Sequence, residues 1–191
     1  IGTRNNTHYG VETAQKIIED LAGANPLIIS GLADGIDGIA HKKALEMGLA
    51  TVGVLGHGLD TMYPTKHRSL AKTMIDNGGL LTEYTTKTIP DKQNFPMRNR
   101  IVAGMCDVIL VIESSETGGA IITAKIGSSY DREICAIPGR ITDKMSLGCN
   151  MLIRKNIVHA VSSADDILEL MNWDKRKKKI AQTEMFLDLS A

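Results

Sequence analysis

Hydrophobic positions along the chain follow two patterns, one typical of amphipathic helices and one typical of buried strands. Between residues 9 and 22, apolar side chains recur three or four positions apart, which predicts a helix with one buried face. These positions are Val11, Ala14, Ile17, Ile18 and Leu21. The apolar run 108–112 is short and lies between polar segments, which is typical of a buried strand.

The two patterns alternate along most of the chain. We expect helices over residues 9–22, 36–47, 66–76, 97–105, 119–129, 148–154 and 164–171. We expect strands over residues 27–29, 50–55, 80–83, 108–112, 133–137 and 157–161. Such alternation predicts an α/β fold with a mostly parallel sheet and helices on both faces. Residues 2–4 are expected to form the turn after a strand whose first residues are absent, which makes the chain a fragment of a longer protein.

The composition indicates where the domain ends. The 191 residues are 43% hydrophobic, which suits one α/β domain, and the 22 basic and 22 acidic side chains leave no net charge to identify a partner. Residues 174–191 are charged and aperiodic, and they include five consecutive basic residues at 175–179. We therefore expect a domain over 1–173, followed by a charged tail or linker to an absent C-terminal domain.

Several kinds of site are disfavoured. The three cysteines are far apart and have no ligand spacing with histidine, so we expect no metal site, no disulfide and a reducing compartment. No apolar run reaches the roughly 20 residues of a membrane helix, which favours a cytoplasmic protein without membrane contact. The G-x-G-x-x-G and P-loop motifs are absent, so no nucleotide cofactor is expected.

Glycine-containing turns follow four of the strands, at residues 2–4, 30–31, 56–58 and 117–119. In parallel α/β sheets the carboxyl ends of the strands form the ligand crevice, where exposed backbone N–H groups at helix starts attract phosphate. The turns therefore predict a phosphate-binding edge. Its candidate residues are Gly2, Thr3, Arg4, Ser30, Gly31, Gly118 and Gly119.

The segment 95–101 also points to an anion. Arg98 and Arg100 flank Asn99 in what we expect to be the first turn of a helix, where positive charge opposes the helix dipole unless an anion lies nearby. Surface ion pairs are the alternative for both arginines. Asn99 either hydrogen-bonds a base or caps the helix, and Phe95 either stacks on a base or packs in the core.

Other polar residues are open to simpler interpretations. Lys144, on a loop after residues 138–139, either contacts phosphate or is simply solvated. Asp37 and His41 are four residues apart, so they share a helix face and are expected to pair with each other rather than act in catalysis. Tyr63 precedes a proline and is expected only to fix a turn.

An ordered set of motifs identifies a family resemblance. The matching stretches are 2–4, 30–37 with 40–41, 54–60 with 63–64, 81–84, 95–101 with 103–104, 118–124, 138–139 and 148–153. They run in the same order as in the DprA/Smf family, which this chain resembles over nearly all of residues 1–173. Asp34 departs from the pattern, since many members have arginine or another residue there, and its charge weakens the local positive field.

The resemblance implies an extended Rossmann-like fold that binds single-stranded DNA and is not an enzyme. It also implies a homodimer that hands the strand to the recombinase RecA in natural transformation; residues 135–172 are a candidate dimer surface. The implied DNA contacts are Gly2, Thr3, Arg4, Ser30, Gly31, Phe95, Arg98, Asn99, Arg100, Gly118, Gly119 and Lys144.

Two other functions compete with this interpretation. One is a nucleotide-phosphate hydrolase of the lysine-decarboxylase-like (LOG) type, which also has a glycine-rich turn after a late strand. Its P-G-G-x-G-T-x-x-E motif is missing, so Glu113 or Glu116 would have to replace the catalytic glutamate. The other is a scaffold that only dimerises.

Overall fold

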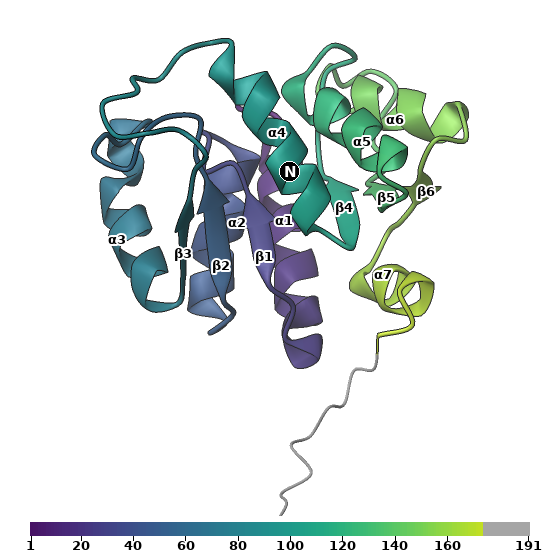
Figure 1. The fold of residues 1–191 in the computed structure, drawn as a ribbon. Coiled ribbons are helices and arrows are strands. Elements are labelled where there is room, and N and C mark those ends of the chain that lie inside the picture. Colours follow the sequence, from purple (N-terminus) through teal and green to yellow (C-terminus); the bar gives the residue numbers. More distant parts are fainter. Residues whose placement is uncertain (174–191) are drawn as a thin grey trace, which may run out of the picture.

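Six strands and seven α-helices alternate along residues 1–173, the part of the chain that the computed structural model describes (Figure 1). The helices are α1 (His8–Leu21), α2 (Ile36–Glu46), α3 (Arg68–Asp76), α4 (Asn94–Met105), α5 (Gly119–Ser129), α6 (Leu147–Arg154) and α7 (Ala164–Leu170). The strands are β1 (Ile28–Ser30), β2 (Thr51–Val54), β3 (Gly78–Leu81), β4 (Val108–Val111), β5 (Glu133–Ala136) and β6 (His159–Ala160). Two short 3-10 helices, η1 (Ala22–Ala24) and η2 (Thr65–His67), complete the order. The expected charged tail, 174–191, lies outside the described residues.

The strands form two parallel three-stranded sheets, in the orders β1-β2-β3 and β4-β5-β6. Residues 1–3 run beside the end of β4, where the Thr3 N–H donates to the carbonyl of Glu113 at 2.8 Å. The carbonyl of Thr3 in turn accepts from the N–H of Ile36, at the start of α2 (3.2 Å). The N-terminal turn therefore joins the carboxyl end of one sheet to the helix that follows β1 in the other.

Helices cover both faces of the second sheet. One apolar core packs α1 and α7 against it, with Ile17, Ile112 and Ile167 among the buried side chains. Another core packs α5 and α6 on the opposite face, around Val111 and Leu152. This arrangement confirms the α/β class with helices on both faces. An apolar cavity of about 580 Å³, lined in part by α1, β1 and β4, lies between the two sheets.

Helix α4 begins at Asn94, three residues before the expected start, so Phe95 and Pro96 lie in its first turn. A proline fits there because the first N–H groups of a helix have no intrahelical partner to lose. Arg98 and Arg100 therefore lie in the second turn, and the expectation that they occupy the first turn is wrong.

Strand β3 also begins earlier than expected. The strand is expected from residue 80, but Gly78 and Gly79 are its first two residues. Gly78 has φ +139°, and a Cβ there would lie 2.1 Å from the carbonyl oxygen of Thr51, so the close approach of the two strands requires glycine. Among residues 1–173, no helix has the length and apolar character needed to cross a bilayer.

Candidate functional site

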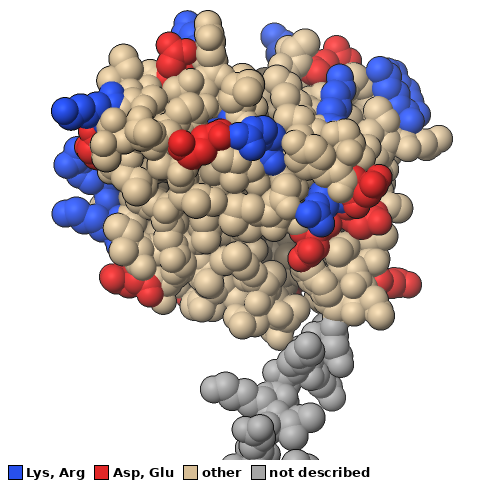
Figure 2. Space-filling view, in the orientation of Figure 1, with Lys and Arg blue, Asp and Glu red and all other residues tan. Residues whose placement is uncertain are grey.

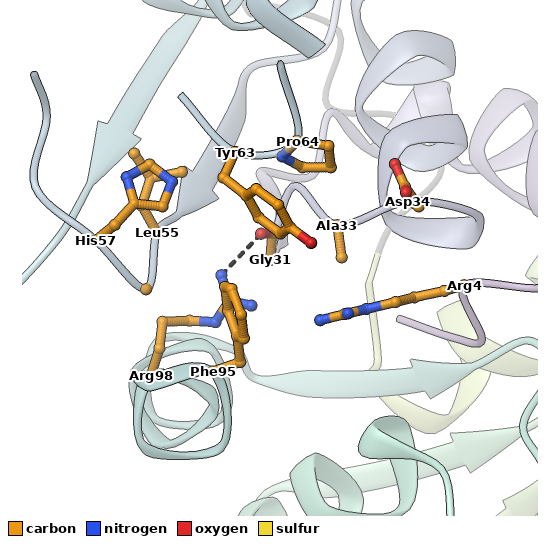
Figure 3. A pocket seen from close by; sticks show the side chains of 11 residues that line it. Arg4, Gly31, Ala33, Asp34, Leu55, His57, Tyr63, Pro64, Phe95 and Arg98 are labelled. Atoms are coloured by element: carbon orange, nitrogen blue, oxygen red, sulfur yellow. Dashed lines mark hydrogen bonds between the residues drawn. The ribbon is translucent and has the colours of Figure 1, made fainter. Parts of the chain in front are cut away.

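A small pocket lies where β1 and β2 end, beside the first turns of α4 (Figure 3). It is lined by Arg4, Gly31, Ala33, Asp34, Leu55, Gly56, His57, Tyr63, Pro64, Phe95 and Arg98. Its volume of about 20 Å³ is close to that of one water molecule. With the side chains in these positions, the pocket has no room for a nucleotide.

Arg98 forms the floor of the site and is only 4% exposed. Its guanidinium donates to the carbonyls of Gly31 (2.7 Å) and Val54, at the ends of β1 and β2. Burial lowers the pKa of this guanidinium, and the nearby Asp37 carboxylate opposes that shift. Arg98 thus ties two strand ends to α4. Both of these bonds come from Nη1, and a contact of Arg98 with DNA stays a prediction.

Ser30 and Gly31 are also part of the support. The Gly31 N–H donates to Asp37 Oδ2 at 3.1 Å, so this donor already has a partner, and a contact of Gly31 with DNA stays a prediction. A Cβ on Gly31 would lie 2.5 Å from the Arg98 guanidinium, which explains the glycine. The Ser30 side chain is buried and lines the apolar cavity between the sheets instead of the pocket.

Arg4, Phe95 and Tyr63, which we call the aromatic–arginine cluster, surround the mouth of the pocket (Figure 3). The Arg4 guanidinium carbon lies 5.3 Å from the centroid of the Phe95 ring, a distance typical of a cation–π contact. The rings of Phe95 and Tyr63 stack with centroids 5.7 Å apart and planes inclined by 29°. Arg4 is exposed, and within residues 1–173 no ion pair is recorded for it.

Tyr63 is the site residue that the sequence interpretation missed. It is 44% exposed and lines the pocket, although it was expected only to fix a turn. The position of Tyr63 could have predicted this, because it is an aromatic residue in a loop after a predicted strand, close to a glycine-containing turn at the expected crevice.

Acidic groups limit the positive field around the site. Asp34 lies on the pocket wall and pairs with Lys66 at 3.0 Å. Arg100, which lies outside the pocket lining, pairs with Glu83, so the surface-ion-pair alternative for this arginine is the one found. Basic and acidic side chains are also interspersed over the face that carries α4 (Figure 2). Only a local positive charge is therefore available at the pocket.

Two further predicted DNA contacts, Asn99 and Lys144, lie outside the pocket lining. Asn99 is half-buried and accepts a hydrogen bond from Arg98 Nε at 3.3 Å. Since α4 starts five residues earlier, Asn99 does not cap the helix. Lys144 is exposed in the turn between β5 and α6, outside the pocket lining.

The N-terminal turn lies between the pocket and the loop 138–146. Thr3 Oγ1 contacts the sulfur of Met145 at 3.3 Å, and a Cβ on Gly2 would lie 2.6 Å from Ile36. Gly118 and Gly119 open α5 at the end of β4, outside the pocket lining. A Cβ on Gly118 would lie 2.3 Å from Ser114 Oγ, whereas Gly119 has open space around it.

Glu113 has a structural contact that limits its chemistry. It is 1% exposed, and its carboxylate accepts from the backbone N–H and the hydroxyl of Thr7, the N-cap of α1. Both carboxylate oxygens are therefore already hydrogen-bonded to Thr7. Glu116 is exposed in the turn before α5.

Parallel strands that end beside an exposed arginine and stacked aromatic rings define a Rossmann-like ligand-binding protein with its site at the carboxyl edge of the sheet. The chain belongs to the DNA recombination-mediator protein A family, whose family model matches residues 1–172. This match confirms the resemblance that the sequence motifs indicate.

Curated relatives match over most of this chain. It is 38% identical to protein Smf of Escherichia coli, over 91% of this chain and 46% of that protein. It is 34% identical to DNA processing protein DprA of Bacillus subtilis, over 97% of this chain and 61% of that protein. The chain therefore spans about half the length of these relatives.

Solved structures agree with the fold. The DprA structure from Streptococcus pneumoniae has a TM-score of 0.83 at 38% identity and covers 88% of this chain and 59% of that one. The Helicobacter pylori protein, whose structure gave insight into its single-stranded DNA binding mode, has a TM-score of 0.82 at 28% identity, over 91% of this chain and 80% of that one. The extended Rossmann-like fold is thus confirmed.

Proposed function

We propose that this domain binds single-stranded DNA across the carboxyl edge of its sheets. The observation that carries the proposal is Arg4: an exposed guanidinium held against an aromatic ring at the mouth of the pocket. Cations that meet phosphates and aromatic rings that meet bases are the usual means of holding single strands. The Helicobacter pylori relative, which has a described single-stranded DNA binding mode, supports the same class of ligand.

The strand would run from the aromatic–arginine cluster past the N-terminal turn. Thr3 connects this turn to the loop that carries Lys144, and Lys144 is exposed to solvent. The N–H of Gly119, at the start of α5, is placed favourably for an anion by the helix dipole, whereas the Gly118 N–H already donates to the carbonyl of Ser115 at 3.1 Å. Arg98, Ser30 and Gly31 would support this surface from below, and contacts of Arg98 and Gly31 with the strand stay predictions.

The domain would act as a binder and not as an enzyme. The hydrolase alternative needs a catalytic glutamate on the helix after the glycine turn. Glu113 is already engaged with Thr7, and Glu116 lies in the turn before α5 instead of on the helix. As a member of a recombination-mediator family, the protein would act in the cytoplasm and pass the strand to RecA.

A mobility-shift assay with a labelled oligothymidylate tests the proposal. Wild-type protein should retard the single strand and release no phosphate from nucleoside monophosphates. Phosphate release without a shift would support the hydrolase. If the protein neither shifts the strand nor releases phosphate, the scaffold interpretation is the one supported.

Self-association is a separate part of the proposal. The family resemblance motivates it, with residues 135–172 as the candidate surface. Light scattering at micromolar concentration should give the mass of a dimer, and a monomer mass alone would contradict it.

A further inference from the structure

We propose that Glu113 is a positioning residue that fixes Arg4 in place for the bound strand. This inference rests on the proposed function and gives a role to a buried acid that the DNA site does not otherwise use. Glu113 is 1% exposed, and within residues 1–173 no basic side chain forms an ion pair with it. Burial of a carboxyl group is costly unless hydrogen bonds replace those that it made with water, so the hydrogen bonds of Glu113 indicate its role.

Glu113 anchors the N-terminal turn at two points. Its backbone carbonyl accepts from the N–H of Thr3, the residue before Arg4, at 2.8 Å. Its carboxylate accepts from the N–H of Thr7 at 2.9 Å and from the Thr7 hydroxyl at 2.5 Å, after Arg4 in the chain. A single residue therefore fixes both ends of the short segment that carries Arg4.

The start of α2 supports the same segment. A Cβ on Gly35 would lie 2.3 Å from the carbonyl oxygen of Thr3 and 2.8 Å from Arg4 Cα, so the backbone of Arg4 rests directly on this glycine. From there the Arg4 guanidinium reaches the ring of Phe95 at 5.3 Å (Figure 3). An arginine that is held in its bound position before the strand arrives loses less freedom on binding, which strengthens its contact with a phosphate.

Gly10 makes room for the Glu113 carboxylate at the start of α1. A Cβ on Gly10 would lie 2.0 Å from Glu113 Oε2, although alanine suits a helix better than glycine does. The Thr7 hydroxyl accepts from the Gly10 N–H at 3.2 Å and donates to Glu113. The first turn of α1 is therefore built around this carboxylate.

A double-mutant cycle with Arg4 tests the positioning role, with a labelled oligothymidylate titrated at several salt concentrations. Glu113→Ala removes the carboxylate anchor, so it should weaken binding and reduce the slope of log affinity against log salt by up to about 0.7, the value for the Arg4 phosphate contact. Because Glu113 acts through Arg4, the double variant Glu113→Ala/Arg4→Ala should bind within about twofold of Arg4→Ala alone. Additive losses, or a wild-type slope in folded Glu113→Ala, would overturn the proposal.

Glu113→Gln is the conservative variant of this cycle. Its side-chain oxygen can accept from the Thr7 N–H, and its amide N–H can donate to the Thr7 hydroxyl, so it should restore the wild-type slope. Binding as weak as that of Glu113→Ala would contradict an anchor made of hydrogen bonds.

Gly10→Ala displaces the carboxylate without changing Glu113, and it keeps the proposal testable if Glu113→Ala does not fold. It should lower the slope in wild-type background and cause no further loss in an Arg4→Ala background, whereas a wild-type slope in folded Gly10→Ala would overturn the proposal. If wild-type protein does not bind the oligothymidylate, the proposed function fails and the positioning role fails with it. If wild-type protein binds and the cycle is additive, only the positioning role fails.

Discussion

Arg4, Arg98 and Arg100 carry the same charge but occupy three different environments. Arg4 is exposed on an aromatic ring, Arg98 is buried beneath the pocket, and Arg100 is paired with Glu83. The residue type alone predicts a cationic site here, but it does not distinguish the environments of the three arginines. The difference arises from long-range contacts, since the carbonyls that bind Arg98 belong to residues 67 and 44 positions away. No local pattern contains that information.

Removal of Arg98 should therefore damage stability more than binding charge. Arg98→Ala leaves the carbonyls of Gly31 and Val54 without a donor and Asp37 without its nearby cation, which should cost about 3 kcal/mol of unfolding free energy. Arg4→Ala, at an exposed position, should change the unfolding free energy by less than about 0.5 kcal/mol. Urea denaturation measures both, and a cost below about 1 kcal/mol for Arg98→Ala would contradict its supporting role.

His41 gives the fold a sensitivity to acid. The ring is fully buried and contacts Thr51 Oγ1 at 2.6 Å, not Asp37 as expected, and burial lowers its pKa from 6.5 to about 4. Since the folded state holds the neutral ring, the stability is present above the unfolded pKa and declines as the pH falls from 6.5 towards 4. At pH 5 the loss relative to pH 7 should be about 2 kcal/mol. His41→Gln should lose less stability over this interval, and an equal loss would assign the acid sensitivity to other groups.

At the scale of elements, the order and type of the helices and strands follow from the hydrophobic pattern, because the periods of buried positions differ between the two. The predicted starts of α4 and β3 are too late, because proline and glycine, here Pro96 and Gly78, are usually taken as breaks in a helix or strand. The first turn of α4 accepts the proline, and β3 uses the glycine to approach β2. These outcomes depend on neighbouring elements, so the local sequence does not contain them.

Gly78 should tolerate substitution poorly for that reason. Gly78→Ala must place a methyl group 2.1 Å from the Thr51 carbonyl at φ +139°, which should cost roughly 2–4 kcal/mol of unfolding free energy. Gly119→Ala is the matched control, because its Cβ meets no atom within 4 Å and should leave stability unchanged or raise it by about 0.5 kcal/mol. Thermal or urea unfolding of the two variants gives the comparison, and similar stabilities would argue against a steric requirement at β3.

At the scale of the whole molecule, strand ends from both sheets meet the N-terminal turn at one edge. Thr3 is bonded to the end of β4 and to the start of α2, so the turn places Arg4 above the pocket between β1 and β2. The crevice could be predicted from the glycine turns, because the carboxyl ends of parallel strands share an edge. Which side chains reach solvent there depends on the packing of α4 and on the loop that carries Tyr63.

The salt dependence of single-stranded DNA binding tests this site most directly. Anisotropy titrations of a labelled oligothymidylate at several salt concentrations give the slope of log affinity against log salt for wild type, Arg4→Ala and Arg154→Ala. Arg154, exposed at the far end of α6, is the matched control. Arg4→Ala should weaken binding and reduce the slope by about 0.7, the value for one phosphate contact on a single strand, while Arg154→Ala should match wild type. If folded Arg4→Ala binds with wild-type affinity and slope, the DNA does not bind at the carboxyl edge of the sheets.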